Sequence, residues 1–259
     1  MQQSVKDFSM DYFSLKGKVA IITGGNTNLG MAYAVAFAKA GADLYIAHYL
    51  PDVEEVKEAV LAEGRRIEFL QGDLTDADYR KRVVAGCMEK YGKIDILVNN
   101  AGMGVFAPFE EFRDEDYARV IDLMLNAAYY LGREVGLIMK EQGGGKIINI
   151  GSALSFTADG GCPPYVIAKH GIIGVTRDFA NELGKYNIQC NALCPGFFKS
   201  DVNTGVPKEI IDRVSAQLPD GKWGEFGQLM GTIVFLASKA SDYINGWSVC
   251  VDGGFTAMI

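Results

Sequence analysis

Three side chains in the second half of the sequence have the types and spacing that proton transfer to an alcohol or ketone requires. Tyr165 and Lys169 are four residues apart, so they share one face of a predicted helix. The unperturbed pKa of a tyrosine is about 10, and a neighbouring ammonium group lowers it by favouring the phenolate. Ser152 precedes this pair, and its hydroxyl is expected to hydrogen-bond the same substrate oxygen. A Tyr-x-x-x-Lys pair also occurs by chance on many helices, so the assignment needs support from the rest of the chain.

A glycine-rich turn near the start of the chain has the pattern of a dinucleotide-binding turn. It follows an apolar run and opens an amphipathic one, which predicts strand, turn and helix in that order. Glycine lets the backbone approach a pyrophosphate, and the helix N-terminus attracts its negative charge. Because glycines mark other tight connections too, the flanking strand and helix carry the interpretation. The predicted cofactor contacts in this turn are Gly24, Asn26, Asn28, Leu29 and Gly30.

Polar and small residues also follow two later apolar runs, where predicted strands end. The carboxyl ends of parallel strands lie at one edge of an open α/β sheet, which is where such sheets bind ligands. Read alone, each of these residues also suits a turn. Together they predict one rim shared with the glycine turn. The residues are Asp73 and Leu74 after one run, and Asn99, Ala101 and Gly102 after the next.

Short apolar runs alternate with longer amphipathic ones along the whole chain. The short runs are rich in Val, Ile and Leu on both faces, as is typical of parallel strands that helices cover on both sides. This alternation predicts a single α/β domain over residues 1–259, a Rossmann-type doubly wound parallel sheet of about seven strands with helices on both faces. The predicted strands are 18–23, 43–48, 66–71, 94–99, 146–151, 188–194 and 247–251. The predicted helices are roughly 29–40, 53–63, 76–91, 114–141, 164–185 and 227–238.

One segment, from about 197 to 226, lacks a strong hydrophobic period and interrupts the alternation late in the chain. Long irregular segments in compact α/β domains are often lids or binding loops. We therefore expect this segment to be the substrate loop.

The composition excludes several kinds of partner. Lys and Arg number 25 against 32 Asp and Glu, and the net charge of −7 argues against nucleic-acid and anionic membrane surfaces. The uncharged stretch 19–38 is broken by the polar glycine turn, so no membrane span is expected. Residues 1–16 lack an apolar region and predict no signal peptide. Five cysteines without a CxxC pair predict a reduced, cytoplasmic protein without a metal site.

Taken together, these motifs resemble those of the short-chain dehydrogenases/reductases over nearly the whole chain. The resemblance extends to two further motifs, Pro-Gly at 195–196 and Val-Asp-Gly-Gly at 251–254. It implies an enzyme that interconverts a secondary alcohol and a ketone with a nicotinamide cofactor, which supplies the redox chemistry. It also implies that Tyr165 is the catalytic acid/base, that Ser152 orients the carbonyl, and that Lys169 lowers the pKa of Tyr165 and binds the nicotinamide ribose.

The same resemblance implies further cofactor contacts and an assembly. Asp73 would hold the adenine and Asn99 the cofactor backbone. A homodimer or homotetramer is expected, acting on a small-molecule substrate. A catalytically silent dinucleotide-binding sensor on the same fold is the alternative from another class of function. The implied contacts at the nicotinamide end are Pro195, Gly196, Phe198 and Ser200.

The end of the second predicted strand favours NAD(H) over NADP(H). His48 lies where an NAD enzyme often has an acidic residue that binds the ribose hydroxyls. NADP enzymes of this family commonly have Arg or Lys at the positions of Thr27 or Tyr49, and neither residue is basic here. An unpaired phosphate carries nearly two negative charges, which an acidic protein disfavours. We therefore expect His48 and Tyr49 to contact the ribose of NAD(H).

Two residues depart from the family's pattern near the predicted site. Asn28 replaces a glycine of the turn, which asparagine can do because it tolerates left-handed backbone. Met124 stands where the family has an asparagine that supports a proton-relay water. Asn126 cannot take over this role, since two residues along a helix turn a side chain by about 200°. The proton path is therefore expected to differ in detail from that of the family.

The substrate class has two alternatives. The segments 13–18, 145–149 and 222–254 are similar to 2-deoxy-D-gluconate 3-dehydrogenases and gluconate 5-dehydrogenases. Those relatives follow Asn-Asn-Ala-Gly with an Ile-Arg-Arg run, which suits a carboxylate, whereas this chain has no basic residue at 103–109 and leaves Lys199 as the cation candidate. The difference favours a hydrophobic ketone over a keto-gluconate, as in hydroxysteroid dehydrogenases of the family. The predicted apolar walls are Val105, Phe106, Phe109 and Phe197, and the aromatic pair Tyr129 and Tyr130 adds to them.

Overall fold

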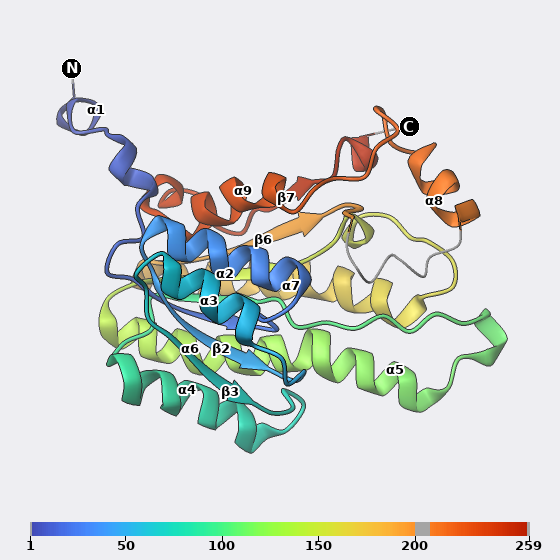
Figure 1. The fold of residues 1–259 in the computed structure, drawn as a ribbon, viewed down its shortest axis with the longest axis horizontal. Coiled ribbons are helices and arrows are strands. Elements are labelled where there is room, and N and C mark those ends of the chain that lie inside the picture. The colour runs from blue at the N-terminus through green and yellow to red at the C-terminus, as the bar shows by residue number, and fades with distance from the viewer. Residues whose placement is uncertain (1, 200–207, 258–259) are drawn as a thin grey trace.

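One parallel sheet organises the part of the chain that the computed structural model describes, residues 2–199 and 208–257 (Figure 1). Its strand order is β3-β2-β1-β4-β5-β6-β7, and every neighbouring pair is parallel. The predicted doubly wound α/β sheet is confirmed. The strands are β1 (Val19–Thr23), β2 (Asp43–His48), β3 (Ile67–Gln71), β4 (Ile96–Asn99), β5 (Gly145–Ile150), β6 (Ile188–Pro195) and β7 (Ser248–Val251).

Helices cover both faces of the sheet, because successive strand residues bury apolar side chains on opposite sides. In β1, Ala20 and Ile22 pack in the core under α2, α3 and α9, whereas Val19 and Ile21 pack in the core under α4, α6 and α7. The helices are α1 (Gln3–Lys6), α2 (Asn28–Ala40), α3 (Glu54–Ala62), α4 (Ala77–Tyr91), α5 (Asp114–Ile121), α6 (Ala127–Gln142), α7 (Pro163–Leu183), α8 (Lys208–Ser215) and α9 (Gly227–Ala237). Within the described residues, no helix is long and apolar enough to cross a membrane.

The helix predicted over 114–141 is divided in the structure. A π-helical turn, η3 (Asp122–Asn126), separates α5 from α6. Such turns insert one residue into the hydrogen-bond ladder and are frequent at functional sites. The segment predicted as irregular contains the short helix α8, which Figure 1 shows at the same end of the molecule as the start of α5.

The carboxyl ends of the strands gather at that end of the molecule. The strand order reverses between β1 and β4, whose residues pair from Ala20 with Ile96 to Ile22 with Val98. Open α/β sheets bind ligands outside the carboxyl ends of their strands at such a reversal. The fold therefore brings the segments that follow β1, β2, β4 and β5 to one edge.

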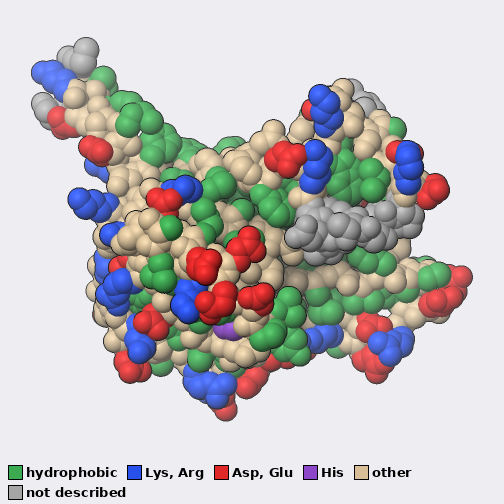
Figure 2. All heavy atoms as spheres, in the orientation of Figure 1, with side chains coloured by type: hydrophobic (Ala, Val, Ile, Leu, Met, Phe, Trp, Pro, Cys, Tyr) green, Lys and Arg blue, Asp and Glu red, His purple; other side chains and the backbone are tan. Residues whose placement is uncertain are grey.

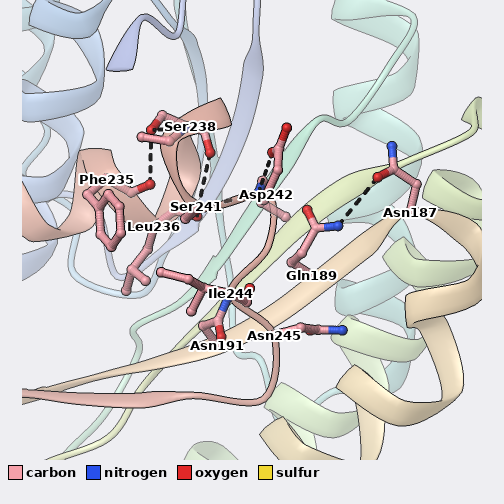
Figure 3. Close-up of polar contacts among 12 residues, drawn as sticks. Asn187, Gln189, Asn191, Phe235, Leu236, Ser238, Ser241, Asp242, Ile244 and Asn245 are labelled. Carbon is pink, nitrogen blue, oxygen red and sulfur yellow. Dashed lines mark hydrogen bonds and ion pairs between the residues drawn. The ribbon is translucent and has the colours of Figure 1, made fainter. Parts of the chain in front are cut away.

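Asparagine side chains at the opposite edge fix the last strand (Figure 3). Asn191 Nδ2 donates to the carbonyl of Ile244 (2.8 Å), and Asn191 Oδ1 accepts from the N–H of Trp247 (2.9 Å). Asn245 Oδ1 accepts from the N–H of Cys190 (2.8 Å). These bonds pin the connection before β7 onto β6. The end of β7 then lies beside the Pro-Gly turn that follows β6, where the N–H of Gly196 donates to the carbonyl of β7's last residue (3.0 Å).

Candidate active site

Ser152 and Tyr165 lie close together although they are thirteen positions apart in the sequence. Ser152 is the second residue after β5 and caps a short 3-10 turn, in which its Oγ accepts from the N–H of Leu154 (3.1 Å). The N–H of Ser152 in turn donates to Oγ of Ser155 (3.1 Å), so the serine is held from both sides. Tyr165 lies in the first turn of α7, and the side chain of Ser152 is near enough to its hydroxyl to lower the pKa of that group. The predicted pair is therefore brought together.

Lys169 joins them from the next turn of α7. Its Nζ donates to the carbonyl of Ile150 (2.6 Å) and lies 5.5 Å from the centroid of the Tyr165 ring. Burial lowers the pKa of Lys169 to about 8, because the apolar surroundings disfavour the charged form. The pair thus has one buried base and one buried acid within reach of each other.

The expected lowering of the Tyr165 pKa is absent from this structure. Burial raises the pKa of Tyr165, and the nearby side chain of Ser152 opposes that rise only in part. The physical reason is that a phenolate loses its hydration inside the protein, while the Lys169 ammonium is directed to a carbonyl oxygen. Tyr165 is consequently protonated at neutral pH in the free protein.

Met124 lies in the π-helical turn and packs against this group. Its side chain is buried with Ala168 and borders Tyr165 and Met103. A small pocket of about 10 Å³, room for about one water molecule, lies between Met124 and Lys169. An apolar side chain therefore replaces the family's amide beside Lys169, but space for a water remains.

The glycine turn after β1 is a close-packed backbone cradle. Gly24 has a φ of 64° and Asn28 a φ of 47°, so both adopt the left-handed backbone conformation, which glycine and asparagine tolerate better than other residues. A Cβ atom on Gly30 would lie 2.0 Å from the carbonyl oxygen of Gly24. The N-cap residue of α2, Thr27, caps no backbone group with its side chain. The N-terminal amides of α2, which no side chain caps, lie beside a turn that begins with two glycines and fit a pyrophosphate.

Sequence reasoning missed the residue that ties this cradle to β4. Asn100 Nδ2 donates to the carbonyls of Thr23 (2.9 Å) and Gly24 (3.1 Å). Oγ1 of Thr23 accepts from the N–H groups of Asn100 (2.9 Å) and Ala101 (3.0 Å). The asparagine pair in Asn-Asn-Ala-Gly pointed to the right place. The sequence did not reveal which asparagine faces the cradle.

The side chains of two predicted cofactor contacts, Asn99 and Asn26, form hydrogen bonds with other groups of the protein. Asn99 Nδ2 donates to Oδ1 of Asn149 (2.9 Å), which links β4 to β5 within the core. Asn26 Nδ2 donates to the carbonyls of Leu50 (3.0 Å) and Asp52 (2.8 Å) and joins the glycine turn to the loop after β2. The side-chain amide nitrogens of Asn99 and Asn26 therefore bond within the protein and shape the site.

Asp73 lies at the rim as predicted, but it has an unforeseen partner. Arg119, from α5, places Nη2 2.9 Å from Oδ2 of Asp73, and its Nη1 donates to Oγ1 of Thr75 (2.7 Å). The other carboxylate oxygen accepts from the N–H (2.9 Å) and hydroxyl (2.8 Å) of Thr75. The bonds from Arg119 and Thr75 outweigh partial burial and lower the pKa of Asp73, so the carboxylate stays charged. Leu74, next to it, lines the pocket beside Lys169.

His48 ends β2 at the predicted position, and its Nδ1 lies 2.8 Å from the carbonyl of Leu50. A carbonyl only accepts hydrogen bonds, so Nδ1 carries the hydrogen and Nε2 is the free nitrogen. Tyr49 follows with its side chain largely exposed. The loop that continues from them contains Asp52, and α3 opens with Glu54 and Glu55. Figure 2 shows acidic side chains gathered over α3.

The residues predicted to contact the nicotinamide end of the cofactor lie at and after the end of β6. Gly196 packs so closely on Asp252 that a Cβ atom would lie 2.6 Å from the Asp252 Cα. Phe198 is buried and packs its ring onto Gly224, where a Cβ atom would meet it at 2.5 Å. Phe198 thus anchors the substrate segment. Ser200 lies outside the described residues. Pro195 ends β6, at the carboxyl edge.

The expected apolar walls are open in the structure. Phe106 and Phe109 are about four-fifths exposed, at 78% and 82%, so they do not enclose a substrate in this chain alone. Val105 does pack near Tyr165. Phe197 packs against Trp223 in a tilted arrangement and against Phe255 in an edge-on arrangement, with ring centroids 5.6 and 5.2 Å away.

The cation and the tyrosine pair predicted near the substrate have partners of their own. Lys199 forms an ion pair with Glu225 (2.6 Å) on the outside of the substrate segment. Tyr129 and Tyr130 lie on α6, where Tyr129 contacts Phe179 and Tyr130 lies under Arg80. These three residues therefore do not form the walls of the site in the structure.

Comparison with known proteins places the chain in a family. The profile of the family described as enoyl-(acyl carrier protein) reductase matches residues 24–256. The chain is 43% identical to an uncharacterized oxidoreductase, YgcW, of Escherichia coli K12, over 98% of each chain. It is 41% identical to 2-dehydro-3-deoxy-D-gluconate 5-dehydrogenase of the same organism, over 95% of this chain and 98% of the relative.

A solved structure gives the same result. The gluconate 5-dehydrogenase of Burkholderia cenocepacia J2315, in complex with NADP and tartrate, superposes with a TM-score of 0.90 at 32% identity, over 96% of this chain and 99% of that one. Together with the Ser152, Tyr165 and Lys169 constellation and the glycine cradle, these matches identify the chain as an oxidoreductase of the short-chain dehydrogenase/reductase family.

Proposed function

We propose that this oxidoreductase interconverts a secondary alcohol and a ketone of a sugar acid with NAD(H). The observation that carries the proposal is the convergence of Ser152, Tyr165 and the buried Lys169, whose Nζ lies 5.5 Å from the centroid of the Tyr165 ring, at the sheet edge that holds the glycine cradle. Similarity to 2-dehydro-3-deoxy-D-gluconate and gluconate 5-dehydrogenases supports the sugar-acid substrate.

The residues of the site suit this reaction. A bound nicotinamide supplies or accepts the hydride. The Tyr165 hydroxyl gives its proton to the ketone oxygen during reduction and takes it back during oxidation, and its protonated state in the free protein suits the reduction. Ser152, fixed by its capping bonds, holds the substrate oxygen. Lys169 stabilises the phenolate while the proton is away, and the water-sized pocket behind it offers a route for a replacement proton.

The preference for NAD(H) follows from the charges around the ribose site. His48 has its Nδ1 hydrogen bonded to a carbonyl, and the next carboxylates along the chain are Asp52 and Glu54. A 2′-phosphate would meet these acids without a basic partner at Thr27 or Tyr49. The NADP bound by the Burkholderia neighbour is a property of that protein.

We expect kcat/KM to be about tenfold or more higher with NADH than with NADPH, since one missing charged hydrogen bond is worth roughly 1.5–3 kcal/mol. Steady-state rates with both cofactors at one substrate concentration provide the measurement. His48→Arg should narrow the gap by raising efficiency with NADPH, whereas His170→Arg, on the exposed side of α7, should not. Equal or better efficiency of the unmodified protein with NADPH would refute the preference.

A second substrate class has an observation in its favour. Met103, Val105 and Tyr165 all pack against the buried cluster of Val120, Met124 and Ala168, which supports an apolar wall suited to a hydrophobic ketone. A screen of keto-gluconates against keto-steroids, followed by nicotinamide absorbance, tests the two. Efficient turnover of a keto-gluconate supports the sugar-acid proposal, and turnover of keto-steroids alone would replace it with the second class.

The surroundings of the site complete the proposal. Residues 197–226 serve as the substrate segment, held by Phe198 at one end and carrying α8.

Exposed apolar side chains on α6 and α7, such as Leu137 and Ile167, support a homodimer or homotetramer, which light scattering of the purified protein tests. A monomer at micromolar concentration would contradict it. The unpaired cysteines support a reducing, cytoplasmic setting.

A further inference from the structure

The short helix α8 carries an arginine onto the loop that leads to Tyr165. Arg213 places Nη1 3.1 Å from Oδ1 of Asp159 and Nη2 3.2 Å from Oδ2 of the same carboxylate. Asp159 lies six residues before Tyr165, in the stretch that begins at Ser152. Val214, next to Arg213, is buried, so the helix is seated on the protein at this point.

This contact lies at the mouth of the site. The N–H of Ala107 donates to the carbonyl of Gly161 (3.1 Å), which joins the loop after β4 to the loop that contains Asp159. Met103 and Val105, from the first of these loops, pack near Tyr165. The two loops are thus joined to each other beside the cluster on which Tyr165 packs, and Arg213 contacts the second of them from the substrate segment.

Other cations near the edge are already committed, as far as the described part of the chain reveals. Lys199 pairs with Glu225, and Arg119 pairs with Asp73. Lys169 is buried and donates to Ile150. Each of the three charges therefore has a partner inside the protein, as the charge of Arg213 does in Asp159.

Arg213 differs from them in its geometry. Asp159 occupies the edge of the guanidinium formed by Nη1 and Nη2, with nearly equal distances. A guanidinium has five N–H donors and a second edge, formed by Nε and one Nη, that can bind a further carboxylate through two bonds. The Arg213 side chain is about half exposed, so the pair with Asp159 does not bury it. Asp159 fixes the direction of the group without using up its donors.

We propose that Arg213 binds the carboxylate of the substrate and thereby determines specificity for acids. The inference rests on the proposed sugar-acid activity. Arg213 would supply the positive charge that the loops 103–109 and 157–163 lack. It also explains how a chain without the Ile-Arg-Arg run keeps such a substrate: the charge comes from the substrate segment instead of the loop after β4.

The test compares Arg213→Gln with the unmodified protein on two substrates, 5-keto-D-gluconate and its neutral methylamide. We expect kcat/KM for the acid to fall about 10- to 100-fold, mostly through KM, because charged hydrogen bonds to the carboxylate are lost. The methylamide should change less than about threefold, which also shows that the variant is folded. For the acid, kcat/KM of Arg213→Lys should lie between those of the unmodified protein and Arg213→Gln, since lysine keeps the charge but loses the planar guanidinium. Lys208→Gln, the same loss of charge on the same helix, should leave both substrates unchanged.

The outcomes separate this inference from the function beneath it. Equal losses on the acid and the methylamide would mean that Arg213 only fastens α8 to the loop, and no loss on either would remove it from the site. In both cases sugar-acid turnover by the unmodified protein stands. If the unmodified protein reduces neither compound, the proposed function fails and the inference fails with it.

Discussion

Replacing Tyr165 with Phe should lower turnover by about 10²–10⁴-fold while NADH still binds with nearly unchanged affinity. The ring is partly buried and phenylalanine fills the same space, so the change removes a hydroxyl beside Ser152 and little else. The substrate oxygen then loses its proposed proton donor, whereas the glycine cradle proposed to bind the dinucleotide follows another strand.

Steady-state rates and NADH fluorescence titrations measure the two effects separately. Tyr91→Phe is the matched control, because it removes a hydroxyl that donates to the carbonyl of Leu44 (2.8 Å) in β2, far along the chain from the site. That variant should keep its turnover. A Tyr165→Phe protein that retains most of its activity would show that another group transfers the proton.

The second large effect is expected from Gly30→Ala, which should abolish cofactor binding and destabilise the fold. A Cβ atom would lie 2.0 Å from the carbonyl oxygen of Gly24 and 2.6 Å from Nδ2 of Asn100. Neither atom can move away cheaply, because Asn100 donates to the carbonyls of both Thr23 and Gly24. The turn must therefore open, at a cost typical of overpacking, about 1–3 kcal/mol.

Thermal melting and NADH titration provide the measurements for this variant. Gly231→Ala in α9 is the matched control, since no atom lies within 4 Å of its added Cβ. Alanine in an exposed helix interior is better than glycine by roughly 0.5–1 kcal/mol, so that variant should melt slightly higher and bind NADH normally. Normal binding by Gly30→Ala would mean that the dinucleotide does not approach this turn.

The sheet was predictable from sequence because its strands are apolar on both faces and each helix carries one apolar stripe. The π-helical turn was not, since the residues 114–141 have one continuous helical pattern and nothing in it marks an inserted residue. Met124 was recognised as a departure from a motif, but only the structure reveals that it leaves a water-sized pocket at Lys169.

Motif spacing predicted where the site lies, but it did not predict which way the individual side chains point. Asn99 and Asn100 are adjacent and chemically identical, yet one enters the core and the other holds the glycine turn, because successive residues at a strand end face opposite ways. The pKa of Tyr165 was predicted in the wrong direction, since spacing along a helix reports the distance to Lys169 but not the burial of both groups.

Long-range ion pairs were beyond the reach of sequence patterns. Arg119 and Asp73 are 46 positions apart, and Arg213 and Asp159 are 54 apart. In the sequence, each arginine is simply a charged residue on an amphipathic helix, and nothing nearby indicates its partner. The tertiary fold pairs the first with Asp73 at the rim and the second with Asp159 on the loop before Tyr165.

Deuterium transfer tests the central claim most directly. The protein is incubated with 5-keto-D-gluconate and NADH deuterated at the transferring position of the nicotinamide, and the product is analysed by mass spectrometry. Our account predicts a gluconate that carries one deuterium at the carbon of the new hydroxyl, formed by the unmodified protein and reduced about 10²–10⁴-fold in rate by Tyr165→Phe. Product without deuterium at that carbon, or no product from the unmodified protein, would contradict it.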